Sequence, residues 1–396
     1  MKNVEISFPN SSIGLLSEMY IKSFVFSCSI HKLYSGAKLI LKDFCKMYFN
    51  EIKNGMEVTV TLREAEPENC TEGQNQFTNH MRVLSFQKIP GTESVLTDEV
   101  EINLISSWFF VNKIGTGVYI GSVGEILSGL CETLISANAG FARGEFYTST
   151  SDPGRRRYQI NEKIQSFMKK LLKYGYVGAV DAQKRLTSAY PIYLYMDAKN
   201  QLNLRCLGDY LNGSIKYSYL PDQADLAFNK SGKVSLGQNV IRLVNYKIVT
   251  SKEPTASSET TYFTTAGFTS MAGFQTKSKM TNSENNNPST AATTPDVVLY
   301  KKWDLTPQDA FATSIKEYCE TNLNTFALVG VLNGFELNAA ALGELVAVTL
   351  PAKDTAQTGQ TISNGGYVVD KVEYVFENDF PQTRVHMFLA KFSSAI

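Results

Sequence analysis

The eight residues GMEVTVTL, at positions 55–62, alternate apolar and polar side chains after an initial glycine. Val58, Val60 and Leu62 fall on one side of an extended chain, and the polar residues between them fall on the other. A period of two is typical of a strand that packs one face against a core. The stretch therefore predicts a half-buried β-strand.

A second stretch, GELVAVTL at positions 343–350, matches the first at the glycine, both valines, the threonine and the final leucine. In each case a polar loop leads to an apolar strand, first at Met81–Phe86 and then at Tyr367–Val372. An alternating strand comes next, at Val100–Leu104 and at Val385–Leu389. Agreement in order and spacing predicts two related β modules whose corresponding strands superpose. The alternative is that the motif is typical of any strand and that the match arose by chance.

These patterns predict a β-rich α+β fold, with two related small β-barrel modules, a helix–helix–hairpin insertion and a long extended loop. Three domains are expected: a first β-barrel module at 1–115, two helices plus a β-hairpin at 116–207, and a second β-barrel module at 208–396. The second module is expected to carry an extended arm at 251–296 and a helix at about 306–322.

The expected insertion has recognisable boundaries. Ser122 and Glu125 form an S-x-x-E capping box, which predicts the start of a helix. The glycine-rich segment 115–124 lacks the spacing of a phosphate-binding loop, so it is interpreted as a flexible connection into that helix. A second helix is expected to begin near Asn161, and residues 193–204 are expected to form a β-hairpin with a polar tip.

The expected arm, residues 251–296, contains no Leu, Ile or Val. Such a composition cannot bury enough apolar surface to offset the cost of ordering its backbone. We therefore expect the arm to lie against a neighbouring subunit, a spike or a tube, and a self-packed surface loop is the alternative. The candidate partner contacts are the aromatic side chains of this arm and a run of three arginines: Tyr262, Phe263, Phe268, Phe274, Arg155, Arg156 and Arg157.

No group of residues in the sequence is typical of an active site. The three histidines, His31, His80 and His386, are far apart in the sequence, and the six cysteines form no C-x-x-C pair. No G-x-S-x-G motif is present. We predict no catalytic, cofactor-binding or metal-binding residues, no cofactor and no enzymatic activity. The scattered cysteines are typical of reduced thiols in a chain made in a cytosol.

The composition of the 396 residues narrows the choice of partners. Lys+Arg and Asp+Glu both number 38, so the chain lacks the basic excess that is typical of nucleic-acid binding. No apolar stretch approaches the roughly 18–20 residues that a membrane-spanning helix needs. Charged residues are only 19%, while Phe and Tyr number 23 and 20. A charge-poor, aromatic-rich chain is expected to be partly covered by other subunits, without membrane insertion or sequence-specific nucleic-acid binding.

The order of these segments resembles the baseplate hub proteins of bacteriophage tails, and the base of the type VI secretion spike and related contractile injection machines. In that family a Q-x-N-E-x-x-x-x-F-x-x-x-L pattern commonly leads into the second helix. The corresponding residues here are Gln159, Asn161, Glu162 and Phe167, with Leu171 or Leu172 close to the last position. The family also usually ends with a Gly-x-Tyr-x-Val strand followed by an alternating strand. Here GGYVV at 365–369 and VHMFL at 385–389 resemble that closing pair.

This resemblance implies a structural subunit of a homotrimeric ring in the baseplate of a virion tail, made in the host bacterial cytoplasm. Such rings join a sixfold tail tube to a threefold central spike and take part in tail assembly and genome ejection. The implied partners are the spike protein, the tail tube protein and, as a further candidate, the tape measure protein. The alternative is a receptor- or carbohydrate-binding tail β protein, and a cell-wall hydrolase is a third hypothesis.

Overall fold

The structure is a computed structural model that describes seventeen stretches of the chain between residues 3 and 389. No helix in these ranges is long and apolar enough to cross a membrane. The ranges are 3–44, 48–64, 76–89, 97–110, 114–136, 142–147, 156–180, 186–211, 213–215, 217–221, 240–249, 260–263, 276–280, 327–338, 342–349, 365–377 and 380–389.

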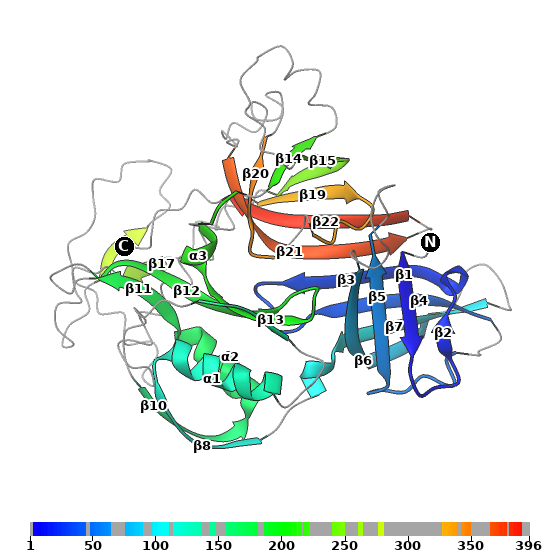
Figure 1. Cartoon of the computed structure of the whole chain (residues 1–396), viewed down its shortest axis with the longest axis horizontal. Helices are drawn as coiled ribbons and strands as arrows, with labels where there is room; N and C mark the ends of the chain where they lie inside the picture. The colour runs from blue at the N-terminus through cyan, green and yellow to red at the C-terminus, as the bar shows by residue number, and fades with distance from the viewer. Residues whose placement is uncertain are drawn as a thin grey trace, which may run out of the picture.

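A 14-stranded sheet dominates this β-rich α+β fold, and its strands come from two stretches of the chain, residues 4–106 and 217–389 (Figure 1). We call its N-terminal half the N-terminal ladder: β1 (Val4–Phe8), β2 (Gly14–Leu16), β3 (Ile21–Ser29), β4 (Gly36–Phe44), β5 (Glu57–Arg63), β6 (Gln76–Ile89) and β7 (Thr97–Ser106). The other half is the C-terminal ladder: β14 (Tyr217–Pro221), β15 (Val240–Leu243), β16 (Asn245–Val249), β19 (Ala327–Asn333), β20 (Leu345–Val348), β21 (Gly365–Glu377) and β22 (Phe380–Leu389).

The two ladders have the same order of hydrogen-bonded neighbours. The N-terminal ladder runs β2–β1–β5–β6–β7–β4–β3, and the C-terminal ladder runs β15–β14–β20–β21–β22–β19–β16. Corresponding strands also follow one another in the same order along the chain. One difference concerns direction: β1 is antiparallel to both of its neighbours, whereas β14 is parallel to both of its neighbours. Agreement over seven strands in each half supports the repeat that the sequence predicts.

The two glycines that begin the matching stretches occupy equivalent places. The Gly55 N–H donates to the Val83 carbonyl at 2.7 Å, and the Gly343 N–H donates to the Val369 carbonyl at 2.8 Å. Both glycines have positive φ angles, 82° and 74°. This conformation is costly for residues with a Cβ, which explains why glycine stands at the start of both strands. The predicted equivalence of residues 55 and 343 is confirmed.

The predicted equivalence of Val100–Leu104 and Val385–Leu389 is wrong by two residues. Val83 lies opposite Leu104, and its equivalent Val369 lies opposite Met387. Met387, and not Leu389, therefore corresponds to Leu104. A shift by two leaves every side chain on the same face of the sheet, so the apolar pattern could not determine the register.

Strands β6 and β21 carry a bulge at the same place, where the register shifts at Leu84 and at Asp370. Before its bulge, β21 pairs with β20; after it, the strand pairs with β3 of the other ladder. A bulge bends a strand and increases its twist. The bulge in β21 thus lies where the strand passes from its own ladder to the junction between the two ladders.

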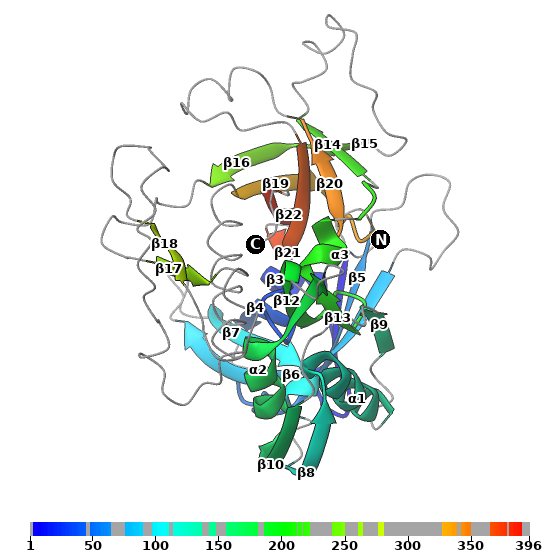
Figure 2. The same ribbon diagram turned by 90° about the vertical axis from the view of Figure 1, so that its left-hand side faces the viewer.

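A smaller part of the molecule packs around two helices, α1 (Val123–Ser136) and α2 (Ile164–Tyr174) (Figure 2). Its hydrophobic core is separate from that of the large sheet. The capping box is confirmed, because the Glu125 N–H donates to Ser122 Oγ at 3.1 Å and the Ser122 N–H donates to Glu125 Oε2 at 2.9 Å. Its remaining strands are β8 (Ile114–Gly121), β9 (Ala142–Phe146), β10 (Arg156–Lys163), β11 (Tyr176–Val180), β12 (Leu186–Met196) and β13 (Gln201–Cys206), with a short helix, α3 (Leu207–Leu211), after β13.

Two expectations for this part are wrong. The segment 115–124 is not a flexible connection, because its first residues form β8 and pair with β10. The second helix begins at Ile164 and not near Asn161, because residues 161–163 continue the β8–β10 ladder. The expected hairpin is confirmed by the pairing of β12 with β13. The domain boundaries stay predictions.

Much of the predicted arm lies outside the described residues, as does the whole predicted helix at about 306–322. Within 251–296 the structure describes the backbone of one two-stranded ribbon, β17 (Thr260–Phe263) and β18 (Thr276–Met280). The role of the arm therefore stays a prediction.

Candidate functional site

The junction between the ladders is built from β3 and the part of β21 that follows the bulge. Here Tyr374 lies opposite Phe26, and Glu373 lies opposite Ser27. The rings of Tyr374 and Phe26 are 6.2 Å apart and at most 1% exposed. Tyr374 and its neighbours Val375 and Phe376 are all buried, so both faces of the strand are covered. An uninterrupted apolar run is typical of such a strand.

Polar groups line one side of the junction. Glu373 accepts a hydrogen bond from His386 at 3.3 Å and pairs with Lys371 at 2.6 Å, and these interactions lower its pKa to about 2. At the bulge, burial raises the pKa of Asp370 to about 6, although the nearby His386 and Lys371 act in the opposite direction. His31, in the turn that follows β3, lies 3.7 Å from the Asp370 carboxylate.

The tip of the β12–β13 hairpin packs onto both ladders. On the N-terminal ladder, the Asn79 amide donates to the Ala198 carbonyl at 2.8 Å, and the Lys199 ammonium lies 5.3 Å from the centre of the Phe77 ring. Asp197 holds the shape of the tip by accepting from the Lys199 and Gln201 N–H groups, each at 2.9 Å. The hairpin thus connects the helical part to the large sheet.

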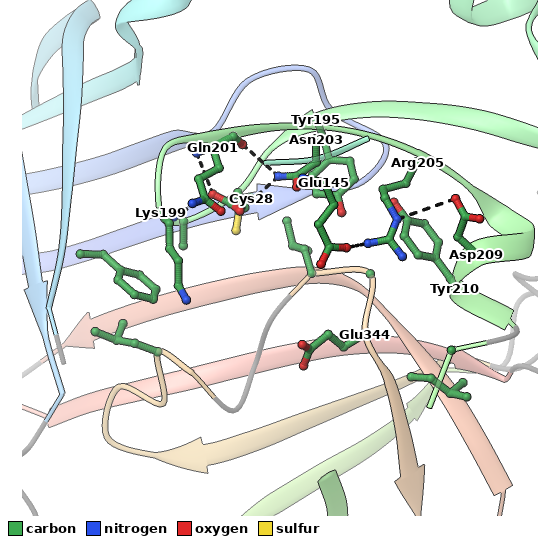
Figure 3. A pocket seen from close by; sticks show the side chains of 18 of the residues that line it. Cys28, Glu145, Tyr195, Lys199, Gln201, Asn203, Arg205, Asp209, Tyr210 and Glu344 are labelled. Carbon is green, nitrogen blue, oxygen red and sulfur yellow. Dashed lines mark hydrogen bonds and ion pairs between the residues drawn. The ribbon is translucent and has the colours of Figure 1, made fainter. Parts of the chain in front are cut away.

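A cavity of about 420 Å³ lies between the hairpin and the C-terminal ladder (Figure 3). Arg205 points into it, forms ion pairs with Glu145 and Asp209, and packs over the Tyr210 ring at 5.1 Å. Burial raises the pKa of Asp197, against the effect of its hydrogen bonds. Asp197, Arg205 and Asp209 therefore have partners within the helical part, where they hold β9, the β12–β13 hairpin and α3 together beside the ladder. In the described part of the chain, no group of three or more His, Cys, Asp or Glu side chains could hold a metal ion.

At Gly343 the helical part packs closely against the C-terminal ladder. A Cβ at this position would lie 2.6 Å from the Tyr210 ring and 3.0 Å from the Tyr195 hydroxyl. At the equivalent Gly55, a Cβ would meet nothing within 4 Å. The helical part therefore packs closely at this turn in the C-terminal ladder and leaves the equivalent turn in the N-terminal ladder open.

Besides its terminal strands β2 and β15, the large sheet leaves β16 and the outer part of β6 with an unpaired edge in the described residues. Beyond its bulge, β6 pairs with β7 on one side only, and β16 pairs with β19 on one side only. The outer part of β6 exposes Ser85, Gln87 and Lys88, and Leu84 is 42% exposed. Unpaired edges are places where another strand can add.

The predicted contact residues that the structure describes lie in β10 and β17, away from the strands of this junction. Arg156 and Arg157 lie in β10, opposite Gly121 and Ile120, and the side chain of Arg157 is exposed. Tyr262 and Phe263 lie in β17, of which only the backbone is described. Arg155, Phe268 and Phe274 lie outside the described residues. All seven stay predictions.

Neither the hairpin contacts nor the unpaired edges of β6 and β16 were predicted from the sequence. The hairpin contacts had no signal of their own, because the positive φ at positions 55 and 343 already accounts for both glycines. The edges had a weak signal: the polar residues Ser85, Gln87 and Lys88 stand where the second copy has Lys371, Glu373 and Tyr374. Only the register of the bulges reveals that these residues correspond.

No protein-family model matches the sequence, and no curated protein matches it significantly. Solved structures do resemble the fold. The 43 kDa tail protein of prophage MuSo2 from Shewanella oneidensis is 11% identical, with 98% of each chain covered and a TM-score of 0.54. The tail protein from Neisseria meningitidis MC58 is 9% identical, with 98% of this chain and 96% of the other covered and a TM-score of 0.52.

A third solved structure is an E. coli protein described as a component of the type VI secretion system. It is 12% identical, and the match covers 100% of this chain and 78% of the other. The TM-score of 0.47 is too low to support an inference. The first two likenesses extend over nearly the whole chain. The resemblance to phage tail proteins is thus confirmed at the level of the fold.

Proposed function

We propose that this chain is a structural hub subunit of a tail baseplate, and that three copies form a ring between a sixfold tail tube and a threefold central spike. In this role the chain takes part in tail assembly and genome ejection, and it catalyses no reaction. It is made in the bacterial cytoplasm and resides in the virion tail.

One observation carries this proposal: each chain contains two ladders with the same strand order, the same bulge and the same glycine–valine hydrogen bond. Three chains in a closed ring would present six similar ladders, which we identify with the two predicted β-barrel modules of each chain. Such a ring has nearly sixfold symmetry where the ladders meet a tube and threefold symmetry elsewhere. The overall likeness to phage tail proteins supports the same role.

The partners follow from this position. The tail tube protein would contact the six ladders, the spike protein would contact the threefold side, and the tape measure protein is a further candidate on the tube side. The aromatic residues of the arm and the arginines at 155–157 are proposed as contacts with these partners or with a neighbouring copy.

The carbohydrate-binding alternative has less support. Tryptophans that stack on sugar rings are exposed, whereas Trp108 is 1% exposed and belongs to the core of the helical part. Trp303, the second tryptophan in the sequence, lies outside the described residues.

The mass of the assembly in solution tests the proposal. Sedimentation and native mass spectrometry of the purified chain, alone and with its spike partner, should give a species of three times 44.0 kDa or a complex that contains three copies. A monomer or dimer under both conditions would contradict the ring. An assay for peptidoglycan cleavage should be negative, and cleavage that depends on this chain would contradict the structural role.

A further inference from the structure

We propose that neighbouring copies in the ring join by antiparallel β-pairing, in which the outer part of β6 from one copy binds the free edge of β16 from the next. The predicted register places Gln87 opposite Val249 and Lys88 opposite Ile248. This inference rests on the proposed ring and specifies the contact that closes it.

The two ladders correspond residue by residue. A row of directly opposed residues crosses four strands in each ladder, from β6 to β3 and from β21 to β16. The row in the N-terminal ladder is Val83, Leu104, Ala37 and Phe26; the row in the C-terminal ladder is Val369, Met387, Leu328 and Ile248. Phe26 of β3 therefore corresponds to Ile248 of β16.

The same alignment continues along the long strands past their bulges. Leu84 corresponds to Asp370, so Lys88, four residues after Leu84, corresponds to Tyr374, four residues after Asp370. Within the chain, Tyr374 lies directly opposite Phe26. Replacing each residue by its equivalent in the other ladder places Lys88 opposite Ile248.

The chain therefore contains one completed junction and both halves of a second one. The completed junction is β21 with β3, and the halves are their equivalents, β6 and β16. In the described residues each half has one strand neighbour and one open edge. One chain cannot join its own halves in this way, because its two ladders already meet at the completed junction. A second copy supplies the missing edge.

The exposure of the side chains agrees with this occupant. At the completed junction β21 has Tyr374 and Val375 buried, whereas the equivalent Lys88 is exposed and Ile89 is half-buried. A strand added at this edge would satisfy the open backbone groups of β6 and cover part of Leu84 and Ile89. Because β6 binds β16 and not another β6, the contact is heterologous. Such a contact generates a closed ring when the rotation between neighbouring copies brings the last copy back to the first.

Disulfide trapping tests the register. In a chain whose Cys45, Cys70 and Cys319 are replaced by serine, Gln87→Cys is combined with Val249→Cys and the protein is oxidised mildly. The expected products on a non-reducing gel are covalent dimers and trimers that disappear on reduction. The matched control combines Gln87→Cys with Ile248→Cys, which shifts one partner by one residue and turns its Cβ to the opposite face. Gln87→Cys alone tests for β6–β6 pairing.

The outcomes separate this inference from the proposed function. Native mass spectrometry of the unoxidised chain reports the ring independently of the disulfide. A trimer without the Gln87–Val249 disulfide, or with as much disulfide in the control, overturns the pairing and leaves the ring standing. Covalent products longer than trimers support the pairing and overturn the closed ring. A chain that stays monomeric at every concentration, without disulfide, overturns both.

Discussion

Strands β6 and β21 occupy equivalent positions in the two ladders, yet their outer halves have opposite character. Both strands bulge at one residue and pair on one side with the next strand in the chain. Past the bulge, β21 has a second neighbour and a run of buried aromatic and aliphatic side chains. Past its bulge, β6 has one neighbour and exposes glutamine and lysine. The difference teaches that a strand's pairing partners, and not its place in the repeat, decide whether equivalent positions carry apolar or polar residues.

Removal of Tyr374 should have the largest effect. Its ring is 1% exposed and packs against Phe26 and Phe335, so Tyr374→Ala should lower the free energy of unfolding by about 3–5 kcal/mol. The equivalent change in β6, Lys88→Ala, should stay within about 0.5 kcal/mol in dilute protein. Urea denaturation of both variants measures the contrast. Similar losses for the two would break the comparison.

The two equivalent glycines should respond unequally to alanine. At Gly55 the new Cβ meets open space, so Gly55→Ala should cost only the strain of a positive φ, about 1–2 kcal/mol. At Gly343 the Cβ also clashes with the Tyr210 ring, and overpacking should add about 1–3 kcal/mol. Thermal unfolding of the two variants gives the order. An equal loss would show that the hairpin yields easily to the added methyl group.

Asp370 should make the bulge of β21 sensitive to pH, whereas Leu84 cannot titrate. Burial raises the folded-state pKa of Asp370 from 3.8 to about 6, so its contribution to stability is present below about pH 4 and is lost as the pH rises to about 6. Asp370→Asn should raise the free energy of unfolding at pH 7 by roughly 3 kcal/mol and flatten its slope between pH 4 and 6. His31, Lys371 and His386 face this carboxylate, and an unchanged slope would mean that they already stabilise its charge.

Glu373 should give the smallest effect, with the opposite sign. Its hydrogen bond from His386 and its pairing with Lys371 lower the folded-state pKa from 4.5 to about 2, so its stabilisation is present above about pH 4.5 and is lost as the pH falls towards 2. Glu373→Gln introduces the residue type found at the equivalent position 87 and should cost about 1 kcal/mol at pH 7. Urea denaturation at pH 7 and at pH 3 should show the cost shrinking at the lower pH, and a constant cost would contradict the assignment.

The sequence predicted those parts of the fold that depend on local pattern. Val58, Val60 and Leu62 define a strand by their period of two, and Ser122 with Glu125 defines a helix start by a local hydrogen-bond exchange. Register lies outside the reach of such patterns, which is why Leu104 aligned with Leu389 and not with Met387. The strand β8 was missed because glycines at 115, 117 and 121 suggested flexibility, whereas pairing with β10 orders them.

The junction could not be predicted, because it depends on contacts between residues distant in the sequence. Tyr374 and Phe26 are each typical strand residues, and nothing near either of them in the sequence indicates that they meet. Likewise, the sequence around Lys88 is typical of a solvated strand, and only the equivalent bulges show that Lys88 corresponds to Tyr374. The prediction of two related modules was within reach because a duplicated motif leaves its signal in both places.

The internal junction also has a kinetic consequence. Strands β3 and β21 belong to one chain, so their effective concentration is high and they can pair as soon as that chain folds. The equivalent edges on β6 and β16 would have to find each other by diffusion, at whatever concentration the cell provides. With this pairing, folding and assembly would become separate events in time. During the interval, Gln87 and Lys88 on one edge and Lys247 on the other would discourage unselective strand addition, since polar and charged edge residues disfavour aggregation.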